Sequence, residues 1–233
     1  METLVTTDNF LDPYREPLLE YRALFLPRLQ ITMIVIGLTG GIGSGKSEVT
    51  QILRNLGAQI IDLDHVGHEA YLPNTKGWTA IIEAFGDSIL EASGEINRKK
   101  LGAKVFSDPN ALKQLNEIIH PRMRAMIMER IQEHRDSKTE VVVVDGAILI
   151  ETGWASLVDE LWVVTASEKV IAQRLNERDG LSLAEVRKRI GAQISTEERE
   201  KHATVVIENN SNIEGLRHKV HDVWESCLRG RKF

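Results

Sequence analysis

The feature that most constrains the fold is the stretch from Gly40 to Ser47, which reads G-G-I-G-S-G-K-S. It matches the phosphate-loop pattern G-x-x-x-x-G-K-[ST]. An apolar run, Ile34–Leu38, precedes it, and apolar residues at helical spacing follow it as far as Leu56. A glycine-rich turn between a buried strand and a helix lets backbone N–H groups approach phosphate oxygens, and the helix adds its positive end. This context predicts a site for nucleotide phosphates.

Two side chains of the loop have expected roles of their own. Lys46 can reach the β- and γ-phosphates of a nucleotide, and the hydroxyl of Ser47 can hold Mg²⁺. Asp145 follows the β-branched run Val141–Val144, an arrangement in which a carboxylate binds Mg²⁺ through water. The alternative for Asp145 is a solvated carboxylate at the end of a strand.

Short apolar runs alternate with helical stretches along the rest of the chain. We expect strands at Gln59–Leu63, Val141–Val144, Leu161–Val164 and Val205–Glu208. This alternation predicts an α/β fold, with a parallel sheet flanked by helices on both faces.

Two helical blocks interrupt the alternation. The first, Trp78–Ile131, is expected to break at Gly86, Gly94 and the Asp108-Pro109 and His120-Pro121 steps. The second, Ser182–Glu200, is predicted as one charged helix, with a capping box formed by Ser182 and Glu185. We interpret them as a helical acceptor-binding insertion at about 75–135 and a lid at about 178–202, within one domain at 33–233.

Residues 1–32 differ from the rest of the chain. They contain three of the six prolines and show no firm helical or strand period. We expect a disordered or non-native extension, and the alternative is a short docking helix around residues 17–25.

Composition narrows the classes of function. The net charge of −5 argues against a dedicated nucleic-acid binder. The one cysteine, Cys227, fits a reducing compartment, and no apolar run reaches the roughly 20 residues that cross a bilayer. The expectation is a cytoplasmic protein that binds neither nucleic acid nor membrane. A monomer is expected, with an oligomer left open.

Among phosphate-loop proteins, the sequence favours a small-molecule kinase. A GTPase should carry a guanine-reading N-K-x-D, and the chain has none. Asp62 and Asp64 end the second predicted strand, and in a parallel sheet ligands bind at the carboxyl ends of strands. Alternation along a strand places both carboxylates on one side, so either could take the proton of an acceptor hydroxyl.

Further motifs, spread over about Ile34 to Val223, resemble those of the dephospho-CoA kinase family. The loop matches the family's own version, and Ile61-Asp-Leu-Asp64 resembles its I-D-A-D. The other matches are Asn97-Arg98 with Leu101-Gly and Val105-Phe106, Ile119-His-Pro121, Leu149-Ile-Glu151, Arg174 with Arg178-Asp179, Arg189-Ile-x-x-Gln193 and Ile207-x-Asn209.

The resemblance implies a phosphate-loop kinase that transfers the γ-phosphate of ATP to the ribose 3′-hydroxyl of dephospho-CoA, with Mg²⁺ as cofactor. It implies Asp64 as the base, with Lys46 and Arg178 stabilising the charge of the transferred group. The ATP-binding residues would be Gly41, Ile42, Gly43, Ser44, Gly45, Lys46, Ser47, Glu48 and Asn209. Dephospho-CoA would be bound by Asp62, Asp64, Arg98, His120 and Glu151, and the metal by Ser47 and Asp145.

The chain departs from the family pattern at four positions. Leu63 replaces the alanine of I-D-A-D, and Glu48 replaces a threonine. His68 stands where many members have arginine, and Asp145 where some have a non-acidic residue. The resemblance therefore gives weaker support to a substrate contact at position 68 and to the metal role of Asp145 than to the other residues.

Two other functions compete with this interpretation. One is a kinase for a different nucleoside or nucleotide, and the other is a regulatory switch that binds a nucleotide and a protein partner. The missing N-K-x-D and the Asp62/Asp64 pair argue against the switch. For Arg187 and Arg189, a solvated helix face is as good an interpretation as a role in the lid. His65, His68 and His120 lack the spacing of a known metal site.

Overall fold

A computed structural model describes residues 33–229, while residues 1–32 and 230–233 lie outside the described part. The predicted N-terminal extension therefore falls outside the described residues.

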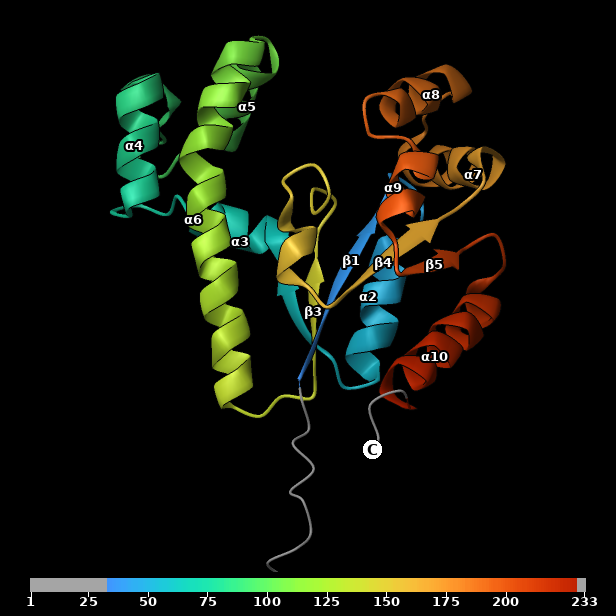
Figure 1. The fold of residues 1–233 in the computed structure, drawn as a ribbon. Coiled ribbons are helices and arrows are strands. Elements are labelled where there is room, and N and C mark those ends of the chain that lie inside the picture. The colour runs from blue at the N-terminus through green and yellow to red at the C-terminus, as the bar shows by residue number, and fades with distance from the viewer. Residues whose placement is uncertain (1–32, 230–233) are drawn as a thin grey trace, which may run out of the picture. The chain divides into compact units, whose positions relative to one another are not determined.

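The predicted α/β sheet is confirmed (Figure 1). Its strands all run parallel, in the order β2-β3-β1-β4-β5. Their bounds are Ile34–Gly40 for β1, Gln59–Asp62 for β2, Val141–Asp145 for β3, Glu160–Thr165 for β4 and Val205–Glu208 for β5.

Alternating side chains of β1 fill two separate cores. Ile34, Ile36 and Leu38 face one core, whereas Val35 faces the other. Every residue of β1 is buried, as expected for a central strand of a parallel sheet.

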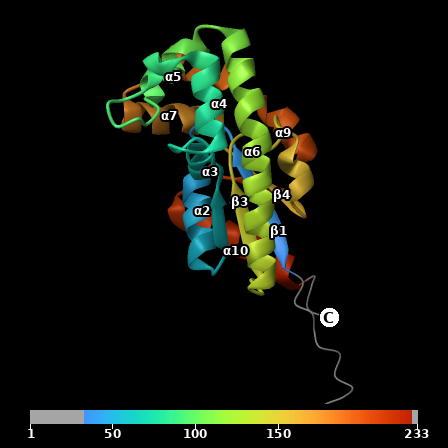
Figure 2. The same cartoon turned by 90° about the vertical axis from the view of Figure 1, so that its left-hand side faces the viewer.

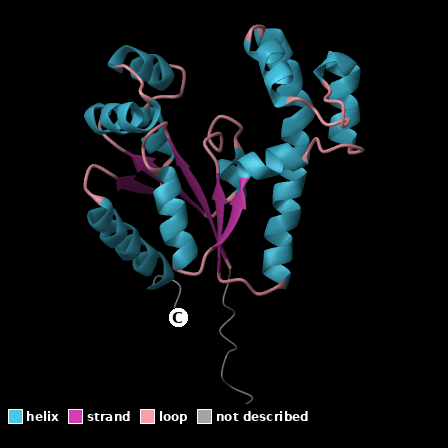
Figure 3. Cartoon of the chain, turned by 180° about the vertical axis from the view of Figure 1, so that it is seen from behind, coloured by secondary structure: helices cyan, strands magenta, loops and turns pink. Residues whose placement is uncertain are grey.

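Helices cover both faces of the sheet (Figures 2 and 3). On one face, α2 (Lys46–Asn55) packs beside α10 (Ile213–Arg229) and buries Val49, Leu53 and Trp224. On the other face lie α3 (Leu63–Glu69) and the long α6 (Pro109–Asp136), which contact each other.

The helical insertion is confirmed as a structural feature, with one correction. It comprises α4 (Lys76–Phe85), the short η1 (Asp87–Ile89), α5 (Arg98–Phe106) and α6. The expected break at His120-Pro121 is wrong, because α6 continues through Pro121. The buried residues Ile119, Met123 and Ile127 flank the proline, and this packing outweighs the loss of one backbone hydrogen bond.

The lid segment also differs from its prediction. After α7 (Glu168–Asp179), the predicted helix Ser182–Glu200 is two helices, α8 (Leu183–Gly191) and α9 (Thr196–His202). The capping box of Ser182 and Glu185 is confirmed. The hydroxyl of Ser195 accepts from the backbone of Glu198 at 3.1 Å, so this second cap starts α9 and separates the two helices.

These two groups of helices rise on opposite sides beyond the carboxyl ends of the strands (Figure 1). One group is α4–α6, and the other is α7–α9, which covers the segment predicted as a lid. The short η2 (Trp154–Leu157) lies between β3 and β4 in the chain. The sheet thus presents its carboxyl edge between the two groups.

One glycine holds the insertion close to α3. A Cβ atom at Gly77 would lie 1.9 Å from the carbonyl oxygen of Ala70, a backbone atom that cannot rotate away. We expect Gly77→Ala to lower the free energy of unfolding by about 1–3 kcal/mol, the usual cost of overpacking, measured by urea denaturation.

Gly191→Ala is the matched control, because nothing lies within 4 Å of the position where its Cβ would be. The same substitution there should leave stability unchanged or raise it by up to about 1 kcal/mol. Equal losses of stability in both variants would contradict the steric account.

Candidate active site

The phosphate loop connects β1 to α2, and two of its glycines need backbone angles that favour glycine. Gly43 has φ of 72° and Gly45 has φ of 92°. A Cβ atom at Gly45 would also lie 2.2 Å from Nδ2 of Asn209. Gly45 therefore provides both the left-handed turn that starts α2 and the close approach of the Asn209 side chain.

Lys46 forms an ion pair with Asp145 across the sheet. The pairing of β1 with β3 sets Leu38 opposite Asp145, so this carboxylate lies next to the strand that leads into the loop. Nζ of Lys46 contacts Oδ1 of Asp145, and Oγ1 of Thr50 donates to Oδ2 at 2.7 Å. Asp145 is only 8% exposed, so its charge is held by these two partners.

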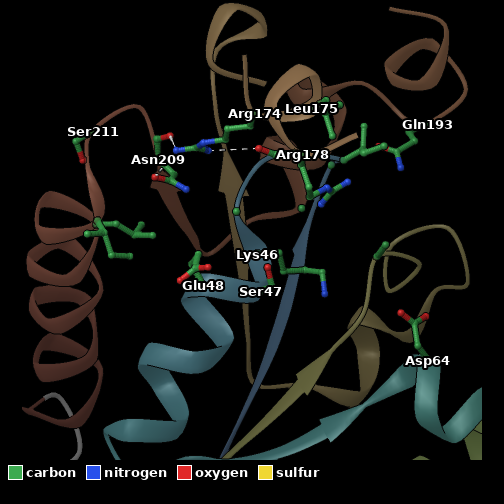
Figure 4. A pocket seen from close by; sticks show the side chains of 18 residues that line it. Lys46, Ser47, Glu48, Asp64, Arg174, Leu175, Arg178, Gln193, Asn209 and Ser211 are labelled. Atoms are coloured by element: carbon green, nitrogen blue, oxygen red, sulfur yellow. Dashed lines mark hydrogen bonds between the residues drawn. The ribbon is translucent and has the colours of Figure 1, made fainter. Parts of the chain in front are cut away.

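A pocket of about 830 Å³ opens over the loop (Figure 4). It is lined by nearly all of the residues expected to bind ATP: Gly41, Ile42, Gly43, Gly45, Lys46, Ser47, Glu48 and Asn209. Ser44 does not line it, because its side chain is buried, and its hydroxyl has no hydrogen-bond partner within residues 33–229.

Two side chains of the lid, Arg174 and Gln193, also line this pocket, although the sequence had indicated no role for them. Oε1 of Gln193 accepts from the backbone N–H of Ile42 at 3.0 Å. Arg174, on α7, lines the pocket and contacts the loop backbone. Both residues belong to motifs that resemble the family's, but no sequence signal indicated that they would bind the loop itself.

Arg178 lies one turn beyond Arg174 and also lines the pocket. Its guanidinium donates to both carboxylate oxygens of Asp179, at 3.0 and 2.7 Å. This pairing raises the pKa of Arg178 and lowers that of Asp179. Arg187 is instead paired with Glu168 at 2.8 Å on an exposed surface of the lid.

The two predicted strand-end aspartates have different positions, and the alternation argument for them is wrong. β2 ends at Asp62, and helix α3 begins at Leu63, so Asp64 is not on a strand. Oδ1 of Asp62 accepts from the backbone N–H of Asp64 at 2.8 Å and so caps α3. Asp64 lies in the first turn of α3 and lines the loop pocket, across from Arg174 and Asn209 (Figure 4).

A second pocket, of about 430 Å³, lies among α3, α5 and α6. Asp64 lines this pocket too, together with the predicted substrate residues Arg98 and His120 and with His68. Most of the wall is apolar, including Leu101, Val105, Phe106, Leu112, Leu115, Ile119 and Met123. Asp62 lines neither of these two pockets.

Glu151, another predicted substrate residue, pairs with a residue of the lid. Its carboxylate lies 3.7 Å from the guanidinium of Arg199, a lid residue that is 4% exposed. Burial lowers the pKa of Arg199, an effect that the charge of Glu151 opposes. Glu151 lines neither of the two pockets and is instead the counter-charge of a buried lid arginine.

These features define a phosphate-loop kinase that acts on a small molecule. They are the parallel sheet, the phosphate loop, the Lys46–Asp145 pair and the two adjoining pockets. A family model described as dephospho-CoA kinase matches residues 34–215. The chain belongs to the dephospho-CoA kinase family, as its sequence motifs indicated.

Individual relatives agree with this assignment. The chain is 43% identical to a dephospho-CoA kinase of Geobacter sulfurreducens over 192 residues, which cover 82% of this chain and 98% of that protein. It is 42% identical to the one of Dehalococcoides mccartyi over 185 residues, 79% of this chain and 93% of the relative. The solved dephospho-CoA kinase from Campylobacter jejuni has a TM-score of 0.66 and 29% identity, and the match covers 84% of this chain and 98% of that one.

The described region has neither a clustered metal site nor a membrane-spanning helix. Residues 33–229 contain no group of three or more His, Cys, Asp or Glu side chains that could hold a metal ion. No helix in the same region is long and apolar enough to cross a membrane.

The Lys46–Asp145 pair leads to a first test of the site. If Lys46 is the cation that stabilises the phosphates, Lys46→Ala should lower kcat by about 100-fold or more, because this side chain lines the loop pocket. Steady-state kinetics measures the loss, and circular dichroism checks that the fold is retained. Turnover near that of the wild type would rule out this role for Lys46.

His120 leads to a test of stability against pH. Its ring lies edge-on to Trp154 at 5.5 Å, and burial lowers its pKa below the ordinary value of 6.5. In the unfolded chain His120 takes up a proton at higher pH than in the folded protein, so its contribution to stability falls as pH drops below 6.5.

We therefore expect His120→Asn to lose less stability than the wild type between about pH 7.5 and about pH 5.5 in urea denaturation. The other six histidines are common to both proteins and cancel in the difference. An identical pH dependence in the two proteins would contradict the effect of burial.

Proposed function

We propose that this kinase transfers the γ-phosphate of ATP to the 3′-hydroxyl of the ribose of dephospho-CoA and releases ADP and CoA. The observation that carries the proposal is the position of Asp64, which lines both the loop pocket and the second pocket. A carboxylate at this junction can accept the proton of an acceptor hydroxyl while the phosphate lies on the other side.

ATP would occupy the larger pocket. Its phosphates would meet the N–H groups of the loop, the positive end of α2 and Nζ of Lys46. Arg178 would complete the charge stabilisation during transfer, after exchanging part of its pairing with Asp179 for the phosphate oxygens. Since Arg178 is largely exposed, this exchange has little desolvation cost.

Mg²⁺ fits the residues present in the loop pocket. The hydroxyl of Ser47 is exposed there, and Mg²⁺ needs few protein ligands when phosphate oxygens and water supply the others. When bound, the ion neutralises charge on the β- and γ-phosphates. Both oxygens of Asp145 accept hydrogen bonds from Lys46 and Thr50, so Asp145 would serve the metal through water rather than by direct ligation.

Dephospho-CoA would occupy the second pocket. The exposed guanidinium of Arg98 suits the diphosphate of this acceptor, and the apolar wall suits its less polar parts. His120 would act there as a neutral ring, because burial lowers its pKa. For Glu151, pairing with Arg199 supports a role in holding the lid.

The setting of the reaction follows from sequence features. We propose a monomeric enzyme of the cytoplasm that needs no nucleic-acid partner, on the basis of the one cysteine and the acidic net charge. The segments 75–135 and 178–202 would act as acceptor-binding insertion and lid of one kinase domain.

Two isosteric substitutions separate catalysis from local structure. Asp64→Asn removes the base and should lower kcat by about 100-fold or more. Asp62→Asn makes the same chemical change two residues away, and asparagine also caps helices well, so activity should stay near that of the wild type. The measurement is CoA formation from ATP and dephospho-CoA.

A wild-type protein that forms no CoA would overturn the substrate assignment. Full activity of Asp64→Asn would overturn only the role of Asp64. If a nucleoside accepted phosphate better than dephospho-CoA, the competing interpretation of a nucleoside kinase would be correct.

A further inference from the structure

We propose that Arg174 and Asn209 are positioning residues that set the orientation of the phosphate loop from its outer side. They bind the carbonyl groups of Gly43 and Ser44, so that the N–H group of Gly45 turns toward the phosphates of ATP. The proposal rests on a nucleotide in the loop pocket and does not depend on which acceptor receives the phosphate. In this proposal Asn209 acts on ATP by holding the loop backbone, whereas the resemblance to the family implied that it contacts ATP directly.

Arg174 reaches the loop with one end of its guanidinium. Nη1 donates to the carbonyl oxygens of Gly43 at 3.3 Å and of Ser44 at 3.2 Å. Nη2 donates to the backbone carbonyl and to Oδ1 of Asn209, both at 3.1 Å. The planar fork of arginine can satisfy several acceptors at once, which a lysine ammonium cannot do in this geometry.

Asn209 completes the connection. Its Nδ2 donates to the carbonyl of Ser44 at 2.8 Å, and its backbone N–H donates to the carbonyl of Thr165 at 2.7 Å. The residue is 3% exposed, so its amide cannot rotate freely into solvent. We call these contacts the Arg174–Asn209 bridge. It joins the loop to α7 and to the carboxyl ends of β4 and β5.

The consequence for the loop follows from the planarity of the peptide bond. In a trans peptide the carbonyl of one residue and the N–H of the next point in opposite directions. Holding the carbonyls of Gly43 and Ser44 on the outer side therefore turns the N–H groups of Ser44 and Gly45 inward. The N–H of Ser44 closes the loop's own turn on Gly41 at 3.2 Å, which leaves the Gly45 amide as the one that the bridge presents to phosphate.

Electrostatics supports the same arrangement. Carbonyl oxygens carry negative partial charge and would repel phosphate if they turned toward it. A guanidinium behind the carbonyls of Gly43 and Ser44 holds them away from that side. Arg178 lies one turn along the same helix, so the bridge also fixes the distance between the loop and this lid arginine.

A direct contact of Arg174 with the nucleoside of ATP is the competing explanation, since Arg174 lines the pocket (Figure 4). Inorganic tripolyphosphate separates the two, because it carries the phosphates without ribose or base. The experiment measures dissociation constants of tripolyphosphate and of ATP, by calorimetry without acceptor, for wild type, Arg174→Gln and Asn209→Leu.

If the bridge positions the loop, each variant should bind both ligands about tenfold more weakly than the wild type does. Within each variant the factor should be the same for tripolyphosphate and for ATP. This is the loss expected for hydrogen bonds with a charged partner. Asn209→Leu nearly preserves size and adds no charge to the pocket, but it removes the amide that donates to the carbonyl of Ser44. It therefore tests the proposal even if Arg174→Gln fails to fold. Arg187→Gln is the control, because Arg187 pairs with Glu168 outside the loop pocket, and it should change neither constant.

Weaker ATP binding with unchanged tripolyphosphate binding would overturn the proposal in favour of contact with the nucleoside. Unchanged binding of both ligands in the variants would show that the loop holds its orientation without the bridge. In either case the assignment of the acceptor would be unaffected, because no acceptor is present in the measurement.

Discussion

The pairing of β1 with β3 is the interaction on which the site depends. Its register sets Leu38 opposite Asp145, and the chain then passes through the phosphate loop and returns with Lys46 beside that carboxylate. Parallel pairing also brings the carboxyl ends of all five strands to one edge. The phosphate loop, Asp62 and the lid helices therefore meet at this edge. The loop follows β1, Asp62 ends β2, and the lid helices follow β4.

The lid acts on the loop as well as on the space above it. The side chain of Gln193 accepts a hydrogen bond from the N–H of Ile42, and Arg174 donates to carbonyl groups further along the loop. On the other side of the pocket, the Asp62 cap starts α3 and sets Asp64 between the two pockets. The geometry of the two pockets thus depends on side chains that bind backbone as much as on those that line the pockets.

Much of this could be predicted from the sequence, because strand runs and the loop motif are local signals. The parallel sheet and the capping box of Ser182 were correctly predicted. Two errors came from competition between local rules. Leu63 and Asp64 were assigned to the end of a strand, but the side chain of Asp62 caps a helix that begins at Leu63. Pro121 was assigned a break that packing within α6 overrides. The pairing of Glu151 with Arg199 joins distant segments, and no local pattern could indicate it.

In the proposed reaction, one phosphate moves past Asp64 from the nucleotide pocket to an acceptor hydroxyl in the adjoining pocket. The most direct test follows γ-phosphate-labelled ATP with dephospho-CoA, and locates the label in the product by mass spectrometry and NMR. We predict one labelled phosphate on the ribose 3′-hydroxyl for each ADP released. Label released as inorganic phosphate, or found at another position of the acceptor, would contradict the account.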